Sequence, residues 1–568
     1  MRLLAKYLRA IPTDVRAYFR PFLYGLFGGL AAVGFQAGIK VLEWVLWTQL
    51  SHIATGYFVL ASLATILVTS LLAGLLIAFV SRDAAGSGIP QLKIAFWRDF
   101  GFLPIKVALV KFFAGIITIG GGCSFGREGP TVHIAGALAS NIAGILGVAK
   151  QGRRPALLSG AAAGLAAAFN TPLSAITFVM EEIVEDLNNT RFLAQTLVAS
   201  VAATFVAHLF LGEDPAFVIP PVQHFSWVLS LLVTPTAALA ALAGVAFQKG
   251  TLIWRDRIKR IQCIPAYLKP VVGAGINWLL GITAFLSIAR LGVFGLGYQD
   301  LESILRGEVG SVHVLILLVA KLAATTTVYA WGGAGGIFSP TLFFGAATGF
   351  FFSTLCSPIV HLSQSDQLAL TVAGMSACLG AVVRAPITSI LIVFEMTHQF
   401  SLIPMLMIGA IASQAVSRAF CSSNFYSEVI ERDGVELDRH IPPRSLATLH
   451  NRPISTLANF SPVFAGSIDS VQIEKLCAEY PYGQFPLVID GRLVGMLDRK
   501  SLLDGHAPEQ AVKQAETVYA SATIREAVAK MVDKSASLLV VLSTDETPIG
   551  IVTLHDVVRL QSQVTDAM

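Results

Sequence analysis

Charge is scarce in this 568-residue sequence: Asp, Glu, Lys and Arg make up 13% of it, whereas apolar residues make up 54%. Soluble domains carry about a quarter of charged residues, so the composition excludes an ordinary soluble protein and predicts a polytopic membrane protein. The net charge of +4 is small, and no basic stretch is interleaved with aromatic residues. We therefore expect no nucleic-acid partner.

Patterns typical of enzymes and metal sites are also missing. The six cysteines form no CxxC pair, which predicts buried free thiols and neither a disulfide framework nor a zinc site. None of the eleven histidines lies in an HExxH motif and no GxSxG occurs, which argues against a hydrolase within the membrane. The apolar stretches hold few acids apart from Glu128, which argues against a metal-ion transporter. No small-residue cleavage site follows the basic N-terminus, so we expect a cytoplasmic segment there and no removed signal peptide.

Long uncharged stretches predict the membrane spans. A bilayer core of about 30 Å needs some 20 apolar residues, and stretches of this kind occur at 57–80, 192–212, 226–248 and 270–289. Two others, 155–180 and 331–360, are uncharged but rich in Gly, Pro and Ala, which predicts interrupted helices that line a cavity. Basic residues at the N-terminus and at 249–269 predict cytoplasmic ends, and the acidic segment 212–224 should lie outside.

The chain also repeats itself. Gly126 to Thr131 matches Gly336 to Thr341 at an offset of 210 residues, and Ser159 to Glu181 matches Ala373 to Glu395 at an offset of 214. The two matches keep their order, which favours a duplication over a chance likeness of Gly/Ala-rich helices. Broken hydrophobic segments at matching places in two halves indicate a transport site at the interface between the repeats.

Three short motifs combine glycine with a following proline: residues 86–90, 126–130 and 335–340. Such a pattern predicts a helix that begins abruptly, with unpaired N–H groups that attract anions without trapping them. Close helix packing is the structural alternative for any one of them. The second motif holds Glu128 in an otherwise uncharged stretch, and an ionisable residue there predicts a transport or coupling site. Simple pairing with Arg127 is the alternative.

These motifs resemble those of the CLC family of chloride channels and chloride/proton exchangers, over roughly residues 20–430. They read GSGIP at 86–90, GREGP at 126–130, GIFSP at 336–340 and Tyr426-Ser427. The resemblance implies an all-α polytopic membrane domain of two inverted halves of tilted, partly re-entrant helices. It also implies a homodimer in the lipid bilayer, in a bacterial inner membrane with both termini cytoplasmic. We expect an N-terminal segment at 1–20, a transmembrane domain at 21–430 with halves at 21–212 and 226–425, a linker at 431–452 and a cytoplasmic domain at 453–568.

The resemblance further implies how chloride is bound. The anion-binding residues would be Ser87, Gly88, Ile337, Phe338 and Tyr426. Ser87 and Tyr426 would offer hydroxyls, and Ile337 and Phe338 would offer backbone N–H groups.

Glu128 would be the gating glutamate and the external proton site, with Gly126, Arg127, Gly129 and Pro130 as supporting residues of its motif. When ionised, its carboxylate would imitate the anion and occupy an anion position. When protonated, it would swing out and admit chloride. One side chain would thereby couple protons to chloride.

Glu182 would be the internal proton site, which favours an exchanger over the alternative, a passive chloride channel. A solvated acidic helix end is the structural alternative, since Glu185 and Asp186 follow. Ser87 stands where nitrate-preferring members carry proline, which favours chloride, and the intact GSGIP and GREGP argue against the fluoride-exporting branch. Lys93 occupies a position that is acidic in some bacterial members.

The mixed charge after residue 425 predicts a soluble part. Two units, 453–505 and 516–561, each with a helix and then two strands, resemble tandem CBS domains, which often bind ATP, ADP or AMP. Thr553 and Asp556 fit the family's ribose-phosphate pattern, and nucleotide would be optional because transport requires no cofactor. The first unit carries Asp498 in place of the hydroxyl, which argues against two full sites. An ordinary helix start is the alternative reading of Thr553 and Asp556.

Overall fold

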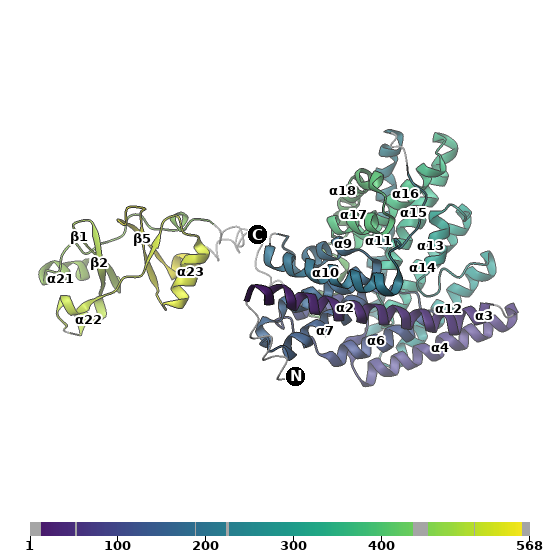
Figure 1. The fold of residues 1–568 in the computed structure, drawn as a ribbon, viewed down its shortest axis with the longest axis horizontal. Coiled ribbons are helices and arrows are strands. Elements are labelled where there is room, and N and C mark those ends of the chain that lie inside the picture. The colour runs from purple at the N-terminus through teal and green to yellow at the C-terminus, as the bar shows by residue number, and fades with distance from the viewer. Residues whose placement is uncertain are drawn as a thin grey trace. The chain divides into compact units, whose positions relative to one another are not determined.

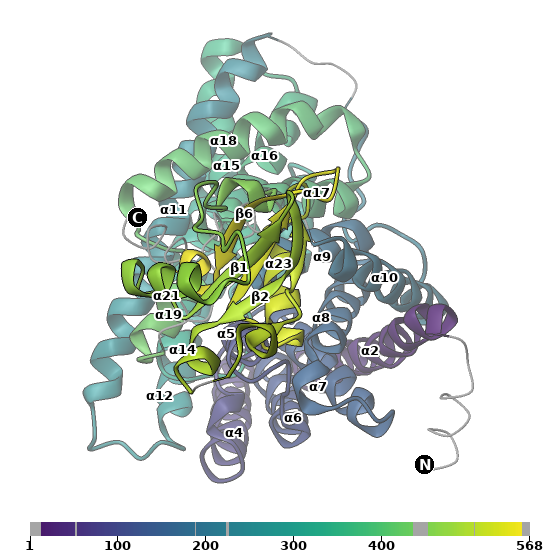
Figure 2. The ribbon, with the colours of Figure 1, turned by 90° about the vertical axis from the view of Figure 1, so that its left-hand side faces the viewer.

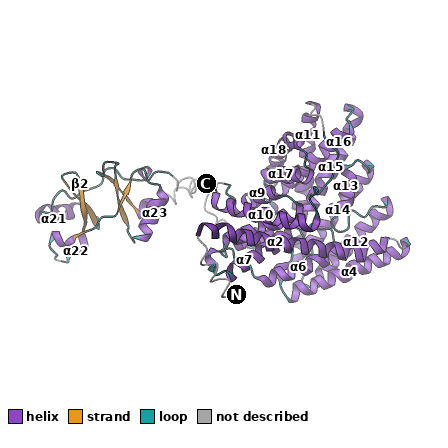
Figure 3. Cartoon of the chain, viewed as in Figure 1, coloured by secondary structure: helices purple, strands orange, loops and turns teal. Residues whose placement is uncertain are grey.

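The computed structural model describes residues 13–51, 54–187, 189–222, 227–435, 452–504 and 506–558. The chain divides into two compact units, Met1–His440 and Ile441–Met568. The first unit is built of helices, and the second combines helices with short strands (Figure 3). Most of the predicted linker, and the first twelve residues of the predicted N-terminal segment, lie outside the described residues.

The first half of the membrane unit runs from α2 to α10. Its elements are α2 (Thr13–Glu43), η1 (Trp44–Thr48), α3 (Gln49–Ser51), α4 (Thr55–Phe79), η2 (Arg82–Ala84), α5 (Ile89–Trp97), α6 (Ile105–Gly120), α7 (Glu128–Ile145), η3 (Lys150–Gly152), α8 (Arg154–Phe169), α9 (Pro172–Phe178), η4 (Val179–Val184) and α10 (Thr190–Leu211). Helix α2 packs against α6, α7, α8 and α10 (Figures 1 and 2). Its described part starts at Thr13, so residues 13–20 of the predicted N-terminal segment lie in this helix.

The second half repeats this order. Its elements are α11 (Trp227–Arg260), α12 (Lys269–Ile288), α13 (Tyr298–Leu305), α14 (Ser311–Ala330), α15 (Phe338–Val360), α16 (Gln364–Val383), α17 (Pro386–Thr397), η5 (Phe400–Leu402), α18 (Ile403–Phe420) and α19 (Phe425–Arg432). In the described part of the chain, nine helices are long and apolar enough to cross a membrane. Short helices such as α5, α9 and α13 lie between them.

Small residues at matching positions let equivalent helices of the two halves pack closely. Gly160 of α8 faces the backbone of Ala135 in α7, and Gly374 of α16 faces the backbone of Gly345 in α15, in each case too closely to admit a side chain. Close backbone approach of this kind is how helices pack where lipid offers no hydrophobic drive. The sequence duplication therefore corresponds to a repeated helix pair.

The predicted spans agree with the helices at three places: 57–80 with α4, 192–212 with α10 and 270–289 with α12. The stretch 226–248 lies within the longer α11. The break predicted within 155–180 occurs at Asn170, whose φ of 59° ends α8 two residues before Pro172 begins α9. The interruption predicted within 331–360 was wrong beyond residue 338, because α15 continues to Val360. Its small residues pack against α16 and do not break the helix.

The cysteine prediction was right in part. All six cysteines are free, but only Cys123, Cys378 and Cys421 are buried. Cys263, in the loop between α11 and α12, is exposed.

The C-terminal unit contains two small sheets, each packed with a helix. Its elements are η6 (Ile454–Thr456), α21 (Ser470–Glu479), β1 (Gln484–Ile489), β2 (Arg492–Asp498), α22 (Arg499–Leu503), η7 (Pro508–Ala511), β3 (Val512–Lys513), β4 (Thr517–Tyr519), α23 (Ile524–Asp533), β5 (Leu538–Leu542) and β6 (Pro548–Thr553). The strand orders are β1-β2-β3 and β4-β5-β6. Both predicted patterns of a helix followed by two strands are present, and in each the two strands are antiparallel. The start of the unit joins the second sheet, since Asn459 bridges Ile551.

Candidate functional site

The two copies of the repeated motif pair directly with each other. Gly126 and Gly336, which precede α7 and α15, exchange two backbone hydrogen bonds of 2.7 Å each. Neither position has room for a side chain, because a Cβ on Gly336 would lie 2.9 Å from the nitrogen of Gly129, and one on Gly126 would lie 3.0 Å from the nitrogen of Ser339. Glycine therefore lets two helix starts from different halves meet.

The start of α5 joins this junction. A Cβ on Gly129 would lie 2.8 Å from the oxygen of Ser87, so the loop before α5 touches the first turn of α7. Gly88 caps α5 with a φ of 93°, a left-handed conformation that favours glycine. Its approach to His133 is also close, since a Cβ there would lie 2.7 Å from the Cβ of His133.

Helix α19 adds Tyr426. Lys93 of α5 donates to the hydroxyl of Ser427 at 3.0 Å, which joins the two helices. Tyr426 is fully buried, and its hydroxyl has no hydrogen-bond partner among the described residues. Such a group is costly, which favours a ligand that accepts from it.

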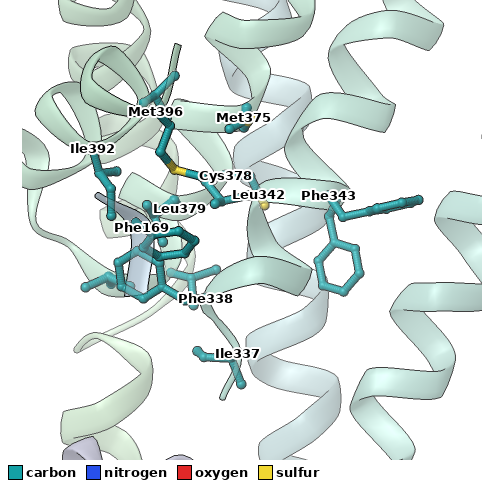
Figure 4. Close-up of a cluster of buried hydrophobic side chains, with 14 of the residues drawn as sticks. Phe169, Ile337, Phe338, Leu342, Phe343, Met375, Cys378, Leu379, Ile392 and Met396 are labelled. Atoms are coloured by element: carbon teal, nitrogen blue, oxygen red, sulfur yellow. The ribbon is translucent and has the colours of Figure 1, made fainter. Parts of the chain in front are cut away.

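Ile337 and Phe338 are anchored by their side chains. The ring of Phe338 packs against Phe169 at a centroid distance of 6.1 Å and against Phe178 at 5.7 Å. Figure 4 shows Phe338 beside Phe169, with Ile337 at the start of the helix below this apolar cluster. Because both side chains are buried and apolar, the polar groups that these residues bring to the junction are their backbone N–H groups.

Glu128 is fully buried and is held by the second half of the chain. Its Oε1 accepts from the hydroxyl of Tyr298 at 2.7 Å and from the hydroxyl of Ser339, and its Oε2 accepts from the Ser339 nitrogen at 3.4 Å. Arg127 instead donates to the carbonyl of Ala168 at 3.1 Å. The structure thus contradicts the alternative in which Glu128 pairs with Arg127.

Glu182 is the second buried acid, with an exposure of 2%. Lys93 reaches its Oε1 at 3.2 Å, and Asn424 donates to its Oε2 at 2.8 Å. Lys93 also pairs with Glu185 at 2.7 Å, and Glu185 is 25% exposed. Glu182 is therefore not a solvated helix end, and its lysine connects it to an acid nearer the solvent.

Tyr298 and Asn424 were missed by the sequence analysis. One signal for Tyr298 was present: Gly295-Leu296-Gly297 precedes it as Gly86-Ser87-Gly88 precedes Ile89, at an offset of 209 residues. Gly88 and Gly297 both adopt positive φ, 93° and 72°, as the caps of α5 and α13. Nothing local marked Asn424.

In the C-terminal unit, Thr553 and Asp556 contact each other. The Oδ2 of Asp556 accepts from the nitrogen of Thr553 at 2.8 Å and from its hydroxyl at 2.6 Å, and the Asp556 nitrogen donates to that hydroxyl at 3.2 Å. This is a helix-start arrangement. It leaves Oδ1 of Asp556 without a hydrogen bond in the described part of the unit.

The fold and the junction define a multi-pass membrane protein in which helix starts from two inverted halves converge around a buried acid. Residues 69–418 match the family model described as voltage gated chloride channel, and residues 511–563 match the CBS domain. The H(+)/Cl(-) exchange transporter ClcA of Vibrio cholerae serotype O1 is 31% identical over 437 residues, which cover 75% of this chain and 92% of that relative. The chain belongs to the voltage gated chloride channel family, a family of transporters, and it carries a CBS domain.

Solved structures agree on the fold. A slow cyanobacterial Cl-/H+ antiporter is 23% identical with a TM-score of 0.66, covering 74% of this chain and 98% of that chain. A eukaryotic CLC transporter is 19% identical with a TM-score of 0.63, covering 95% and 98%. A CLC-type fluoride/proton antiporter is 18% identical with a TM-score of 0.61, covering 73% and 98%. The predicted family and fold class are confirmed.

Proposed function

We propose that this chain is a chloride/proton antiporter of the membrane, and that its sites are the residues named from the sequence. The observation that carries the proposal is the junction at which the starts of α5, α7 and α15 meet around Glu128. Helix starts offer weak, uncharged donors that replace the hydration of an anion. An acid held at the same place competes with that anion and exchanges a proton.

Chloride binds between the start of α15 and two hydroxyls in this proposal. Ile337 and Phe338 contribute backbone N–H groups, and the loop of Ser87 and Gly88 closes another side through its contact with α7. The buried hydroxyl of Tyr426, which has no partner in the described part of the chain, supports its assignment as a donor to the anion.

Two acids carry the proton. Glu128 is the gate and the external site, and Glu182 is the internal site. Burial of both acids supports the antiporter over the passive chloride channel, because a channel needs no buried internal acid. The link from Glu182 through Lys93 to the partly exposed Glu185 offers a route to solvent.

Purified full-length protein in liposomes distinguishes the two functions. An imposed pH gradient should drive chloride uphill, and the reversal potential in a chloride gradient should move when the pH gradient is changed. Empty liposomes are the control. A reversal potential that follows chloride alone would establish a passive channel.

We further propose that the protein forms a homodimer, as its family implies, and that both of its termini lie in the cytoplasm. The basic end of α11, with Arg257 and Arg260, supports a cytoplasmic loop before α12. The exposed Cys263 in that loop provides the test. An impermeant maleimide should label it in inverted membrane vesicles and not in intact cells, with Cys263→Ser as control. Labelling in intact cells would show that the topology is the reverse of the one proposed.

The dimer has its own test. Single-molecule photobleaching of a singly tagged chain should give two steps, whereas one step would contradict the dimer.

An adenine nucleotide is proposed at the CBS domain, with Thr553 and Asp556 toward the ribose and phosphate. Oδ1 of Asp556 accepts no hydrogen bond from the described residues, which supports this, because a carboxylate oxygen accepts from ribose hydroxyls. Calorimetric titration of the full chain with ATP, ADP and AMP should show binding of at least one nucleotide, and Asp556→Asn should weaken it. If none of the three nucleotides gave heat of binding, Thr553 and Asp556 would serve only as a helix cap.

A further inference from the structure

Tyr298 is positioned as tightly as Glu128 itself. It is the first residue of α13, directly after Gly297 with its φ of 72°. The loop before it is fixed by the fully buried Lys321, whose ammonium donates to the carbonyls of Gly292 at 2.7 Å and Gly295 at 3.3 Å. The phenol of Tyr298 therefore projects from a turn, just before α13, that these hydrogen bonds hold in place.

The first half contains the same device. The fully buried Lys111 lies 210 residues before Lys321, and its ammonium donates to the carbonyls of Gly86 at 3.0 Å and Ala85 at 3.3 Å. That turn presents Ser87 beside α7. The equivalent turn of the second half presents Tyr298 to Glu128. The turn before α5 thus lies at the proposed anion site, and its equivalent before α13 lies at the acid.

The ring of Tyr298 is held on two sides. The guanidinium of Arg127 lies over it at 5.3 Å from the centroid, and the ring of Phe217 meets it edge to face at 5.6 Å. These contacts involve the ring and not the hydroxyl, so Tyr298→Phe keeps them. Loss of the oxygen removes only the contacts to Glu128 and Ser339.

The hydroxyls of Tyr298 and Ser339, hereafter the hydroxyl pair, lie 2.6 Å apart and both reach Oε1 of Glu128. An ionised carboxylate only accepts hydrogen bonds, and the pair plus the Ser339 nitrogen supply three donors. A protonated carboxyl carries a donor of its own and matches this set less well. Hydrogen bonds to an ionised partner are also roughly twice as strong as neutral ones.

We propose that Tyr298 is a positioning residue, an inference that rests on the antiport function proposed above. Its hydroxyl retains ionised Glu128 in the buried position seen in the structure, where the carboxylate blocks the anion, and thereby sets the transport rate. Tyr298 does not touch chloride and carries no proton. Its hydroxyl acts through Glu128 alone, so its effect exists only while that carboxylate is present.

Tyr298→Phe in the otherwise intact chain, reconstituted in liposomes, tests this. Chloride turnover should rise about tenfold, the scale of one hydrogen bond to a charged group, while the number of chloride ions moved per proton stays the same. Ser339→Ala should change the rate in the same direction. Tyr24→Phe is the matched control, because it removes a phenol oxygen from a buried tyrosine of α2, and its rate should equal that of the wild type.

The decisive comparison adds Glu128→Ala. In that background Tyr298→Phe should leave chloride flux unchanged, because no carboxylate remains to be held, and the two substitutions are then non-additive. An unchanged or slower rate of Tyr298→Phe in the wild-type background would overturn the proposal, and so would an acceleration that persists without Glu128. If wild-type protein shows no proton-coupled chloride flux, the antiport function itself has failed, whereas coupled flux at an unaltered rate in Tyr298→Phe rejects only the role of Tyr298.

Discussion

Glu181 and Glu395 each cap the start of the helix that carries the other. Glu181, in the π-helix η4 that continues α9, accepts from the nitrogen and hydroxyl of Thr388 at 2.8 and 2.7 Å, in the first turn of α17. Glu395, near the end of α17, accepts from the nitrogen and hydroxyl of Ser174 at 2.8 and 2.6 Å, in the first turn of α9. Acids at helix starts satisfy unpaired N–H groups. The matched acids of the duplication thus tie the two halves together, while the adjacent Glu182 faces Lys93 instead.

Removal of one cap should lower stability without affecting coupling. Glu395→Ala leaves two backbone N–H groups, those of Leu173 and Ser174, without an acceptor, at a cost of about 1–3 kcal/mol for a buried donor. The midpoint of thermal unfolding in detergent should fall, and the chloride/proton ratio should be retained. Glu181→Ala is the symmetric partner and should have a similar effect. A changed ratio in Glu395→Ala would show that this acid takes part in proton movement.

Glu182→Val should uncouple the two ions. Without the internal site, chloride flux continues and proton flux falls to background. Lys93 keeps Glu185 as a partner in this variant, so no buried charge is left alone. Parallel recordings of chloride efflux and of pH in the same liposomes provide the measurement, with Glu181→Gln as the neighbouring control. Proton flux at the wild-type ratio in Glu182→Val would remove this residue from the proton route.

Glu128→Ala should retain chloride flux and abolish proton flux. The small side chain vacates the position that the carboxylate occupies against the hydroxyl pair and carries no exchangeable proton. Chloride efflux and pH change measured together would show the separation. Continued proton transport in this variant would contradict the gating role.

The parts of the site that the sequence predicted are those with local causes. Pro130 and Pro340 mark helix starts, because N–H groups in the first turn of a helix have no acceptor within the helix and proline lacks that group. The glycines before these prolines permit the contact between Gly126 and Gly336. The partner of Glu128 could not be predicted this way. Tyr298 lies 170 residues from Glu128, and no hydrophobic period or turn signal joins positions so distant.

Other misses have the same physical origin. Lys93 and Glu182 are 89 residues apart, so their ion pair depends on how α5 packs against η4 and not on the sequence of either segment. The stretch 331–360 contains the same residue types as 155–180, yet it is non-helical only before Phe338, whereas 155–180 breaks in its middle, at Asn170 and Thr171. Gly and Ala permit either close packing or a break, and tertiary contacts decide between them. The strands β5 and β6 of the C-terminal unit, by contrast, followed from local pattern alone.

Gly88→Ala should abolish chloride flux. The substitution places a methyl group 2.7 Å from the Cβ of His133 and strains a residue with a φ of 93°, so the start of α5 must move away from α7. Gly491→Ala is the matched control, because its φ of 75° is similar but a Cβ there meets nothing within 4 Å. Chloride efflux from liposomes should be lost in the first variant and normal in the second. Normal flux in Gly88→Ala would show that the α5 start does not shape the anion site.

Asp433 anchors the helix that begins beside Tyr426. It follows the end of α19 and accepts from Arg255 at 2.7 Å and from Lys259, both at the end of α11. Burial alone would raise the pKa of Asp433, but the hydrogen bonds from Arg255 and Lys259 outweigh it and hold the pKa below its ordinary value. A carboxyl of this kind stabilises the fold above its unfolded pKa, about 4, and loses that contribution only as the pH falls through the lower folded value.

The anchor therefore stays charged over the range in which exchange is measured. Asp433→Asn should lower the thermal midpoint of unfolding and weaken chloride binding at Tyr426. It should leave the shape of the flux profile between about pH 5 and 7.5 unchanged, because the wild-type carboxyl does not titrate there. Calorimetric titration with chloride measures the binding, and chloride flux recorded at a series of pH values gives the pH profile. A displaced pH profile would mean that Asp433 gains and loses a proton during transport, which its two cationic partners oppose.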